Sequence, residues 1–212
     1  SLLKKRCKIL TISSHVGNAP TIKNWLKGDL YEWPPHEMTE EYLVTRKDSM
    51  IRIESATGSQ KDDYPSKSQF KAMIEHCDLK NDSTMICLVG TRPEAESVAS
   101  EISRLFRSRK NKLEASVTDL ADEETPLLKR LDRVLKNGVA FHHAGLSVDA
   151  REFVESLLGS RRINVVVCTP TLSHGVDFPL DNAVVCMDSF GRNALKKIEY
   201  VQYRGRASRI GG

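Results

Sequence analysis

Residues 163–168 read Ile-Asn-Val-Val-Val-Cys, and residues 169–179 continue as Thr-Pro-Thr-Leu-Ser-His-Gly-Val-Asp-Phe-Pro. The first part is a predominantly apolar run, which is typical of a central strand in a parallel sheet. The second part carries hydroxyls at Thr169 and Thr171, a flexible Gly175 and a carboxylate at Asp177. Hydroxyls and backbone amides suit a phosphodiester backbone, and a carboxylate accepts hydrogen bonds from ribose hydroxyls. The loop is therefore a candidate binding segment; the alternative is a polar turn between two strands.

From residue 84 onward, strands and helices are expected to alternate in units of about 30 residues, the size of a strand-helix-strand unit. Strands are expected at 84–90, 139–141, 163–168 and 183–187, with helices at 91–106, 122–135 and 147–159 between them. This alternation predicts an α/β fold, a parallel sheet with helices on both faces in three α/β/α layers. Ligands bind beyond the carboxyl ends of the strands in such sheets, so Thr91, His143 and the loop at 169–179 are expected at one edge.

The first part of the chain shows weaker patterns. The elements expected there are a strand at 8–12, a helix from Asn18 to about Lys27, strands at 41–45 and 50–54, and a loop at 55–65. The first helix is expected to bury Trp25, together with Ile22 and Leu26. A capping-box pattern, Ser66-x-x-Gln69, predicts a further helix to about Cys77.

Composition indicates a soluble globular protein of 212 residues with a net charge of +4 and a pI near 8.8, which permits an anionic partner without requiring one. None of the five cysteines forms a Cys-x-x-Cys pair. Cys87, Cys168 and Cys186 lie in apolar runs and are expected to be buried thiols in a reducing intracellular compartment. No apolar run approaches the length of a membrane-spanning helix, so no membrane association is expected. The abrupt start at Ser1 suggests a fragment of a longer protein.

A basic cluster lies near the carboxyl terminus, where residues 199–210 read Glu-Tyr-Val-Gln-Tyr-Arg-Gly-Arg-Ala-Ser-Arg-Ile. Arg206 and Arg209 are three residues apart, so on a helix they share one face. Two guanidinium groups on one face suit a bound polyphosphate, and Gly205 permits close approach of a ligand. The alternative is a solvated basic helix end.

Two shorter motifs each have two interpretations. His142 and His143 point to opposite faces if they end a strand, so they do not chelate one metal ion, and no metal site is expected. Thr91-Arg92-Pro93-Glu94 either presents a helix N-terminus to phosphate or is only a cap. The chain contains no Gly-x-x-x-x-Gly-Lys-[Ser/Thr] loop, so by itself it is not expected to hydrolyse a nucleotide.

Taken together, the motifs resemble superfamily 2 helicases. Thr-Pro-Thr-Leu-x-x-Gly-Val-Asp-x-Pro at 169–179, followed by Tyr-x-Gln-x-x-Gly-Arg-Ala-x-Arg at 200–209, is similar to motifs V and VI. Phe141 to Leu146 resembles the His-His-Ala-Gly-Leu signature of the superkiller-type branch. That branch includes exosome-associated RNA helicases and archaeal fork-processing DNA helicases. Residues 85–91 stand where motif IV belongs, and residues 12–18 match the motif III region.

The resemblance implies that residues 36–212 are the second of two RecA-like domains, and that residues 1–35 are the end of the first domain plus a linker. ATP would bind with Mg²⁺ between the two domains, and the missing first domain would supply the P-loop and the magnesium ligands. By position, Arg209 would be the arginine finger, Arg206 a second phosphate contact, and Gln202 a coupling residue. The nucleotide-side residues would be Gly175, Asp177 and Gly205, and the nucleic-acid contacts would be Thr169, Thr171, His143, Thr91 and Arg92.

The implied function is therefore that of the motor half of an ATP-dependent helicase acting on single-stranded or partly duplex nucleic acid, with DNA favoured over RNA. Two departures from the family pattern leave an alternative open. Ser208 replaces a glycine of motif VI, and Ser14-His15 replaces the usual Ala-Thr of motif III. The alternative is a non-catalytic nucleic-acid-binding or scaffold module of helicase ancestry.

Overall fold

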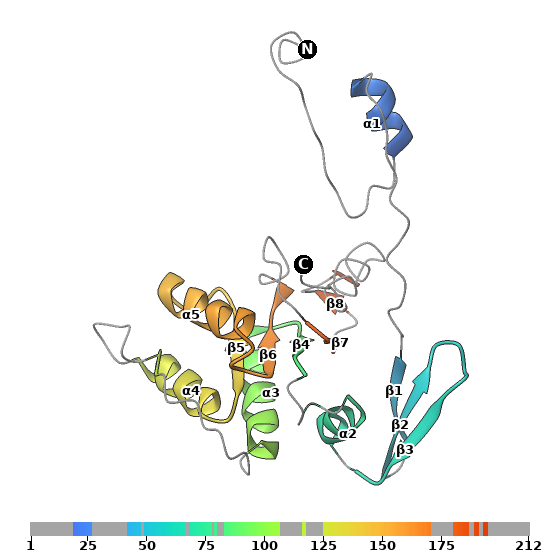
Figure 1. The fold of residues 1–212 in the computed structure, drawn as a ribbon, viewed down its shortest axis with the longest axis horizontal. Coiled ribbons are helices and arrows are strands. Elements are labelled where there is room, and N and C mark those ends of the chain that lie inside the picture. The colour runs from blue at the N-terminus through green and yellow to red at the C-terminus, as the bar shows by residue number, and fades with distance from the viewer. Residues whose placement is uncertain are drawn as a thin grey trace. The chain divides into compact units, whose positions relative to one another are not determined.

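The computed structural model describes residues 19–26, 42–47, 49–66, 68–77, 79, 83–106, 116–117, 125–170, 180–186, 189–190 and 193–194 (Figure 1). The chain divides into two compact units, Ser1–Glu37 and Met38–Gly212. The strand expected at 8–12 lies outside the described residues.

The larger unit contains a four-stranded parallel sheet, as the alternating pattern predicts. Its strands are β4 (Met85–Leu88), β5 (Val139–His142), β6 (Val165–Cys168) and β7 (Asn182–Val185). They lie in the order β5-β6-β4-β7, and every neighbouring pair is parallel. The register places Leu88 beside Cys168 and Val185, and Cys168 beside His142, so all four carboxyl ends lie at one edge.

Three helices cover this sheet: α3 (Arg92–Leu105), α4 (Pro126–Leu135) and α5 (Val148–Gly159). Helix α3 packs against β5, β6 and α4, and α5 packs against β5. His142 reaches Glu155 of α5, whereas His143 faces Glu96 of α3. Because neighbouring side chains of a strand point to opposite faces, α5 and α3 lie on opposite sides of the sheet. The predicted three-layer α/β/α fold is confirmed.

The caps of these helices agree with the sequence in two cases out of three. Thr91 and Glu94 form the predicted capping box, and the Ser147 hydroxyl accepts a hydrogen bond from the Ala150 N–H. Helix α4, however, begins at Pro126 rather than at Asp122, because the Thr125 side chain caps it and proline favours the first helical turn.

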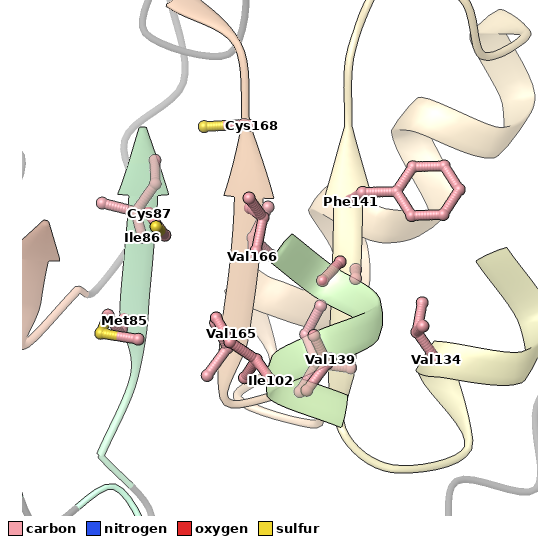
Figure 2. Packing of buried hydrophobic residues seen from close by; sticks show 14 of the residues in the cluster. Met85, Ile86, Cys87, Ile102, Val134, Val139, Phe141, Val165, Val166 and Cys168 are labelled. Carbon is pink, nitrogen blue, oxygen red and sulfur yellow. The ribbon is translucent and has the colours of Figure 1, made fainter. Parts of the chain in front are cut away.

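The strands and helices bury a continuous apolar core, in which every residue of β4, β5 and β6 is buried (Figure 2). Strand β7 is the outer strand of the described sheet and is only half-buried. Cys186, which follows it, is exposed, so the predicted burial of this thiol is wrong. Within the described sheet, β7 has a neighbour on one side only, which accounts for the exposure of the residue that follows it.

A second sheet precedes the parallel one. It consists of β1 (Tyr42–Lys47), β2 (Met50–Ser55) and β3 (Lys61–Tyr64) in antiparallel order β1-β2-β3. The first two strands were predicted, but β3 lies in the segment expected to be a loop. Its sequence, Lys-Asp-Asp-Tyr, has little strand propensity. It pairs with β2, where Arg52 donates to both carboxylate oxygens of Asp63 at 2.8 and 2.9 Å.

Helix α2 (Gln69–His76) packs against β2 and buries Phe70, Met73 and Ile74 as predicted. Its cap is Ser68, not Ser66, so the predicted capping box is wrong. The Ser66 hydroxyl instead accepts a hydrogen bond from the Ser68 N–H at 3.1 Å, which closes a turn just before the helix.

In the smaller unit the described element is α1 (Ala19–Leu26). Trp25 is 73% exposed, so its predicted burial is wrong. Within the described part of this unit, one eight-residue helix offers no second surface large enough to enclose an indole ring. Among the described residues, no helix combines the length and apolar character needed to cross a membrane. Near the carboxyl terminus, Ser189–Phe190 (β8) and Asn193–Ala194 (β9) form a short antiparallel pair that was not predicted.

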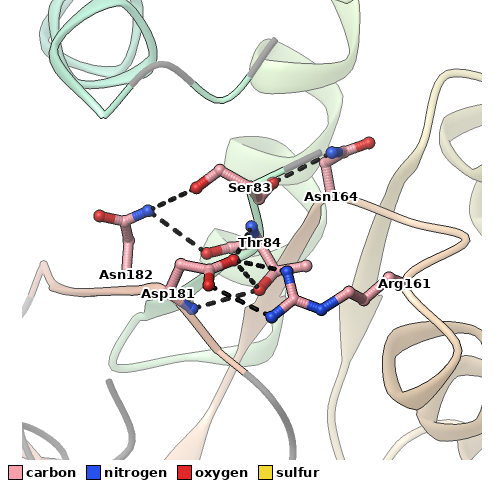
Figure 3. Close-up of polar contacts among 6 residues, drawn as sticks. All are labelled: Ser83, Thr84, Arg161, Asn164, Asp181 and Asn182. Carbon is pink, nitrogen blue, oxygen red and sulfur yellow. Dashed lines mark hydrogen bonds and ion pairs between the residues drawn. The ribbon is translucent and has the colours of Figure 1, made fainter. Parts of the chain in front are cut away.

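A polar cluster joins the amino ends of β4 and β7 (Figure 3). One carboxylate oxygen of Asp181 accepts hydrogen bonds from the Thr84 N–H at 2.8 Å and the Thr84 hydroxyl at 2.9 Å. Arg161 donates to both oxygens of the same carboxylate. Further bonds of the cluster tie Ser83 to Asn164 and Asn182, and tie Thr84 to Asn182. The cluster therefore anchors the start of β7 to the start of β4, at the end of the sheet opposite the predicted site.

Candidate nucleic-acid interface

The loops that leave β4, β5 and β6 are held together at the carboxyl edge of the sheet. Beyond the paired strand residues, the Val89 N–H donates to the Cys168 carbonyl at 2.9 Å, and the Thr169 N–H donates to the His142 carbonyl at 3.2 Å. These bonds extend the sheet by one residue on β4 and β6. Thr91, His143 and Thr169 are thereby brought to one edge, as the order of the elements predicted.

At the end of β4, Thr91 caps α3. The Thr91 N–H donates to Glu94 Oε2 at 2.9 Å, and the Glu94 N–H donates to Thr91 Oγ1 at 3.4 Å. Both Thr91 and Arg92 are exposed. The protein's own Glu94 carboxylate therefore occupies part of the helix N-terminus, so an anionic ligand has the Arg92 guanidinium as its nearest charged partner in this turn.

At the end of β5, the buried His143 makes hydrogen bonds to the backbone of the turn that follows it. Its ring is 1% exposed and stacks on Phe141, with ring centroids 5.4 Å apart and planes inclined by 7°. The Gly145 N–H donates to Nδ1 at 3.1 Å, and the Leu146 N–H donates to the His143 carbonyl at 3.0 Å. Ala144 and Gly145 are exposed above the ring. His143 thus fixes the backbone of a turn that faces solvent.

Gly145 leaves little room for a side chain in this turn. A Cβ atom at this position would lie 3.0 Å from His143 Nδ1, 3.1 Å from Cε1 and 3.6 Å from Arg92 Cδ. The first two distances are shorter than ordinary carbon contacts, and the third shows that the Arg92 side chain lies next to the turn. The exposed turn backbone and the Arg92 side chain consequently form one continuous surface.

The electrostatics of the two histidines follow from their burial. Burial lowers the pKa of His143, although Glu96, whose Oε1 lies 3.5 Å from Nε2, acts in the opposite direction. Glu96 also accepts a hydrogen bond from Arg130 Nε at 2.8 Å. Burial likewise lowers the pKa of His142, against the hydrogen bond between its Nε2 and Glu155 at 2.9 Å. Both rings are therefore held in the neutral form near neutral pH.

A neutral His143 has a defined proton position. Nδ1 accepts from the Gly145 N–H, so the ring proton resides on Nε2, which faces Glu96. Because His142 and His143 turn toward different helices, they do not share a ligand. Among the residues that the structure describes, no group of three His, Cys, Asp or Glu side chains is placed to hold a metal ion.

The structure describes four of the predicted site residues. Thr91 and Arg92 are exposed, whereas His143 and Thr169 are buried beneath the edge, Thr169 with 7% exposed. The nucleic-acid contacts assigned to them stay predictions. The predicted site residues outside the described part of the chain are Thr171, Gly175, Asp177, Gln202, Gly205, Arg206 and Arg209.

Two supporting residues were not found from the sequence. Glu96 and Glu155 hold the two histidines from α3 and α5, yet each lies far from its partner along the chain. Both are acidic residues within helices, where they are indistinguishable from ordinary solvated positions. Only the packing of the helices on β5 reveals them.

The sheet order and the helical layers are those of a RecA-like α/β domain. The helicase conserved C-terminal domain family matches residues 106–211, and the chain belongs to this family.

Its curated relatives are helicases. The chain is 30% identical over 210 residues to the ATP-dependent DNA helicase Hel308 of Thermoplasma acidophilum, covering 96% of this chain and 29% of the relative. It is 30% identical over 213 residues to Hel308 of Pyrococcus horikoshii, covering 96% and 28%. It is 27% identical over 231 residues to the helicase POLQ-like protein of Drosophila melanogaster, covering 99% and 22%. The chain thus spans less than a third of the length of these relatives.

Proposed function

We propose that this chain is the second RecA-like domain of an ATP-dependent DNA helicase, within a longer protein. The observation that carries the proposal is the match of 96% of the chain to relatives named as ATP-dependent DNA helicases. Because these relatives are DNA helicases by name, DNA is favoured over RNA as the partner. In this proposal residues 1–35 complete the first domain and the linker, and residues 36–212 form the second. The division into compact units after Glu37 is compatible with that boundary.

The carboxyl edge of the sheet is the proposed track for a single strand. Arg92 supplies a charged donor, and the turn at Ala144 and Gly145 supplies exposed backbone beside it. A guanidinium group and exposed backbone N–H groups both suit contacts to phosphate and sugar, which carry no sequence information. Thr91, Thr169 and Thr171 would contribute further contacts to the strand, and His143 would position the turn. Such an interface binds DNA without strong sequence preference.

The proposed ATP chemistry depends on the arginine cluster at 199–210. Arg209 would stabilise charge on the transferring phosphoryl group, Arg206 would contact phosphate, and Gln202 would couple the site to the strand. Gly175, Asp177 and Gly205 would line the nucleotide. ATP and Mg²⁺ would be held mainly by a first domain that carries the P-loop. The support for these roles is the order and spacing of the motifs.

The test is DNA-stimulated ATP hydrolysis by the longer protein. Replacement of an arginine finger costs about 10³ to 10⁵ in rate, so Arg209→Ala should lose stimulated hydrolysis and retain ATP binding. Arg204→Ala is the matched control, because it removes an arginine of the same cluster that lies outside the motif pattern. Equal activity of Arg209→Ala and the wild type would refute the assignment. A wild type without stimulated hydrolysis would favour the non-catalytic scaffold.

A further inference from the structure

Two thiols meet where β4 and β7 run side by side. Cys87 lies within β4, and Cys186 is the residue after β7. Their Sγ atoms are 3.4 Å apart, and both are free cysteines. The Cys186 N–H donates to the Leu88 carbonyl at 2.8 Å, so Cys186 is held against β4 by its backbone as well. The backbone of Cys186 is therefore positioned by the sheet next to β4, within reach of the Cys87 side chain.

The two thiols differ in a chemically useful way. Cys87 is fully buried, whereas Cys186 is exposed. The hydrogen bond with the Cys87 thiol lowers the pKa of Cys186, although burial and the nearby Glu94 oppose this effect. The same hydrogen bond, together with burial, raises the pKa of Cys87 well above its ordinary value. The thiol on the more exposed residue, Cys186, is thus the one that loses its proton first, while Cys87 keeps its proton.

We propose that Cys186 and Cys87 form a reversible disulfide when the protein is oxidised by hydrogen peroxide. The Cys186 thiolate attacks one peroxide oxygen, the O–O bond breaks, and the departing hydroxide takes up a proton to become water. Cys87 then attacks the sulfur of the resulting Cys186 sulfenic acid. The S–O bond breaks, and the second oxygen leaves as water with the proton of Cys87. Two thiols and one peroxide become one disulfide and two waters, and a dithiol reductant reverses the change.

The geometry requires a small movement. A disulfide brings its sulfur atoms to about 2.05 Å, so the pair must close by roughly 1.4 Å. Cys87 lies between β6 and β7 inside the sheet, whereas Cys186 is beyond the last paired residue of the outer strand. The movement therefore falls on Cys186. Because Cys87 lies just before the Thr91 cap, the bond would also tether β7 to the candidate interface. That consequence rests on the proposed function, but the disulfide itself does not.

Cys168 is the competing thiol. It ends β6 on the other side of β4, and its sulfur points toward β4 (Figure 2). Cys168 is fully buried, so peroxide lacks the access to it that it has to Cys186. Because reactivity follows thiolate character and exposure, Cys168 is expected to stay reduced.

In the test, the purified protein is treated with hydrogen peroxide, its free thiols are alkylated, and its proteolytic peptides are identified by mass spectrometry. We expect a peptide pair linked through Cys87 and Cys186, and a loss of two free thiols per chain. Cys168→Ser is the matched control and should leave the linked pair unchanged. Cys186→Ser should slow the oxidation of Cys87 by roughly tenfold or more, because a buried thiol is poorly accessible.

Cys87→Ala gives the sharpest result, since alanine is small and apolar and suits the interior of β4. Without its partner, Cys186 should stop at the sulfenic acid, which dimedone traps; in the wild type the trapped product should be minor. Circular dichroism verifies that each variant is folded. A wild type that accumulates the dimedone adduct without the linked pair would overturn the proposal. So would a disulfide between Cys87 and Cys168.

Discussion

Replacing Asp181 should destabilise the sheet more than replacing its ion-pair partner Arg161. The Asp181 carboxylate accepts the N–H and the hydroxyl of Thr84, and Thr84 is fully buried (Figure 3). Asp181→Ala removes the acceptor for both of these donors. Removing the partner of a buried polar group costs about 1–3 kcal/mol. The Arg161 pair adds little, because the two side chains are 44% and 40% exposed and such pairs contribute about 0–1 kcal/mol.

The expected loss for Asp181→Ala is therefore about 2–3 kcal/mol in the free energy of unfolding, mostly from Thr84. For a domain of this size, that corresponds to a fall of roughly 4–12 °C in the unfolding temperature. Arg161→Ala should cost less than about 1 kcal/mol. Arg161→Gly should cost still less, because Arg161 has a φ of 53°, a backbone conformation that glycine adopts without strain.

Urea unfolding followed by circular dichroism measures these differences. Partial burial acts to raise the pKa of Asp181, but the hydrogen bonds from Arg161 and Thr84 lower it by more. The pKa of this carboxyl group is therefore below its ordinary value. The carboxylate therefore contributes stability above about pH 4, and this contribution disappears as the pH falls through the depressed pKa. The gap between the wild type and Asp181→Asn should narrow over that range. Equal losses for Arg161→Ala and Asp181→Ala would show instead that the exposed ion pair is the main contribution of Asp181.

Three further predictions concern the carboxyl edge. Gly145→Ala should lower the free energy of unfolding by about 1 kcal/mol, because its Cβ would lie 3.0 Å from His143 Nδ1 and the ring or the turn would have to shift slightly. Ala144→Gly, at the adjacent exposed position, is the control for urea unfolding. The free energy of unfolding should decrease as the pH falls below about 6.5. Burial holds the pKa values of His142 and His143 below their ordinary value, so these rings take up protons in the unfolded chain first. His143→Asn keeps an acceptor near the position of Nδ1 and should make this decrease smaller. If the protein contacts about three phosphates of a labelled single strand, its affinity should fall roughly 20-fold between 50 and 200 mM salt. Arg92→Ala should reduce the slope of log affinity against log salt concentration. An affinity that does not depend on salt would contradict an interface to phosphate.

Much of the fold followed from local patterns. The capping box of Thr91 and Glu94, the cap at Ser147 and the apolar run of β6 each involve residues within a few positions of one another. The failures had longer-range causes. Strand β3 forms because it pairs with β2 and because its Asp63 binds Arg52 of β2. The composition of β3 by itself indicates neither interaction. Cys186 lies in an apolar run but is exposed, because the sheet order leaves β7 on the outside.

The amino-acid sequence by itself determined the alternation of strands and helices, the edge at which the loops gather, and the resemblance to helicase motor domains. These features depend on periodicity, caps and the order of motifs along the chain, which can all be read without knowing which elements pack together. Tertiary structure alone decided the partnerships: His143 with Glu96, Asp181 with Thr84, and Cys87 with Cys186. Each pair joins residues from separate elements. Their distances are set by the strand order β5-β6-β4-β7 and by the packing of helices on it, which no local pattern encodes.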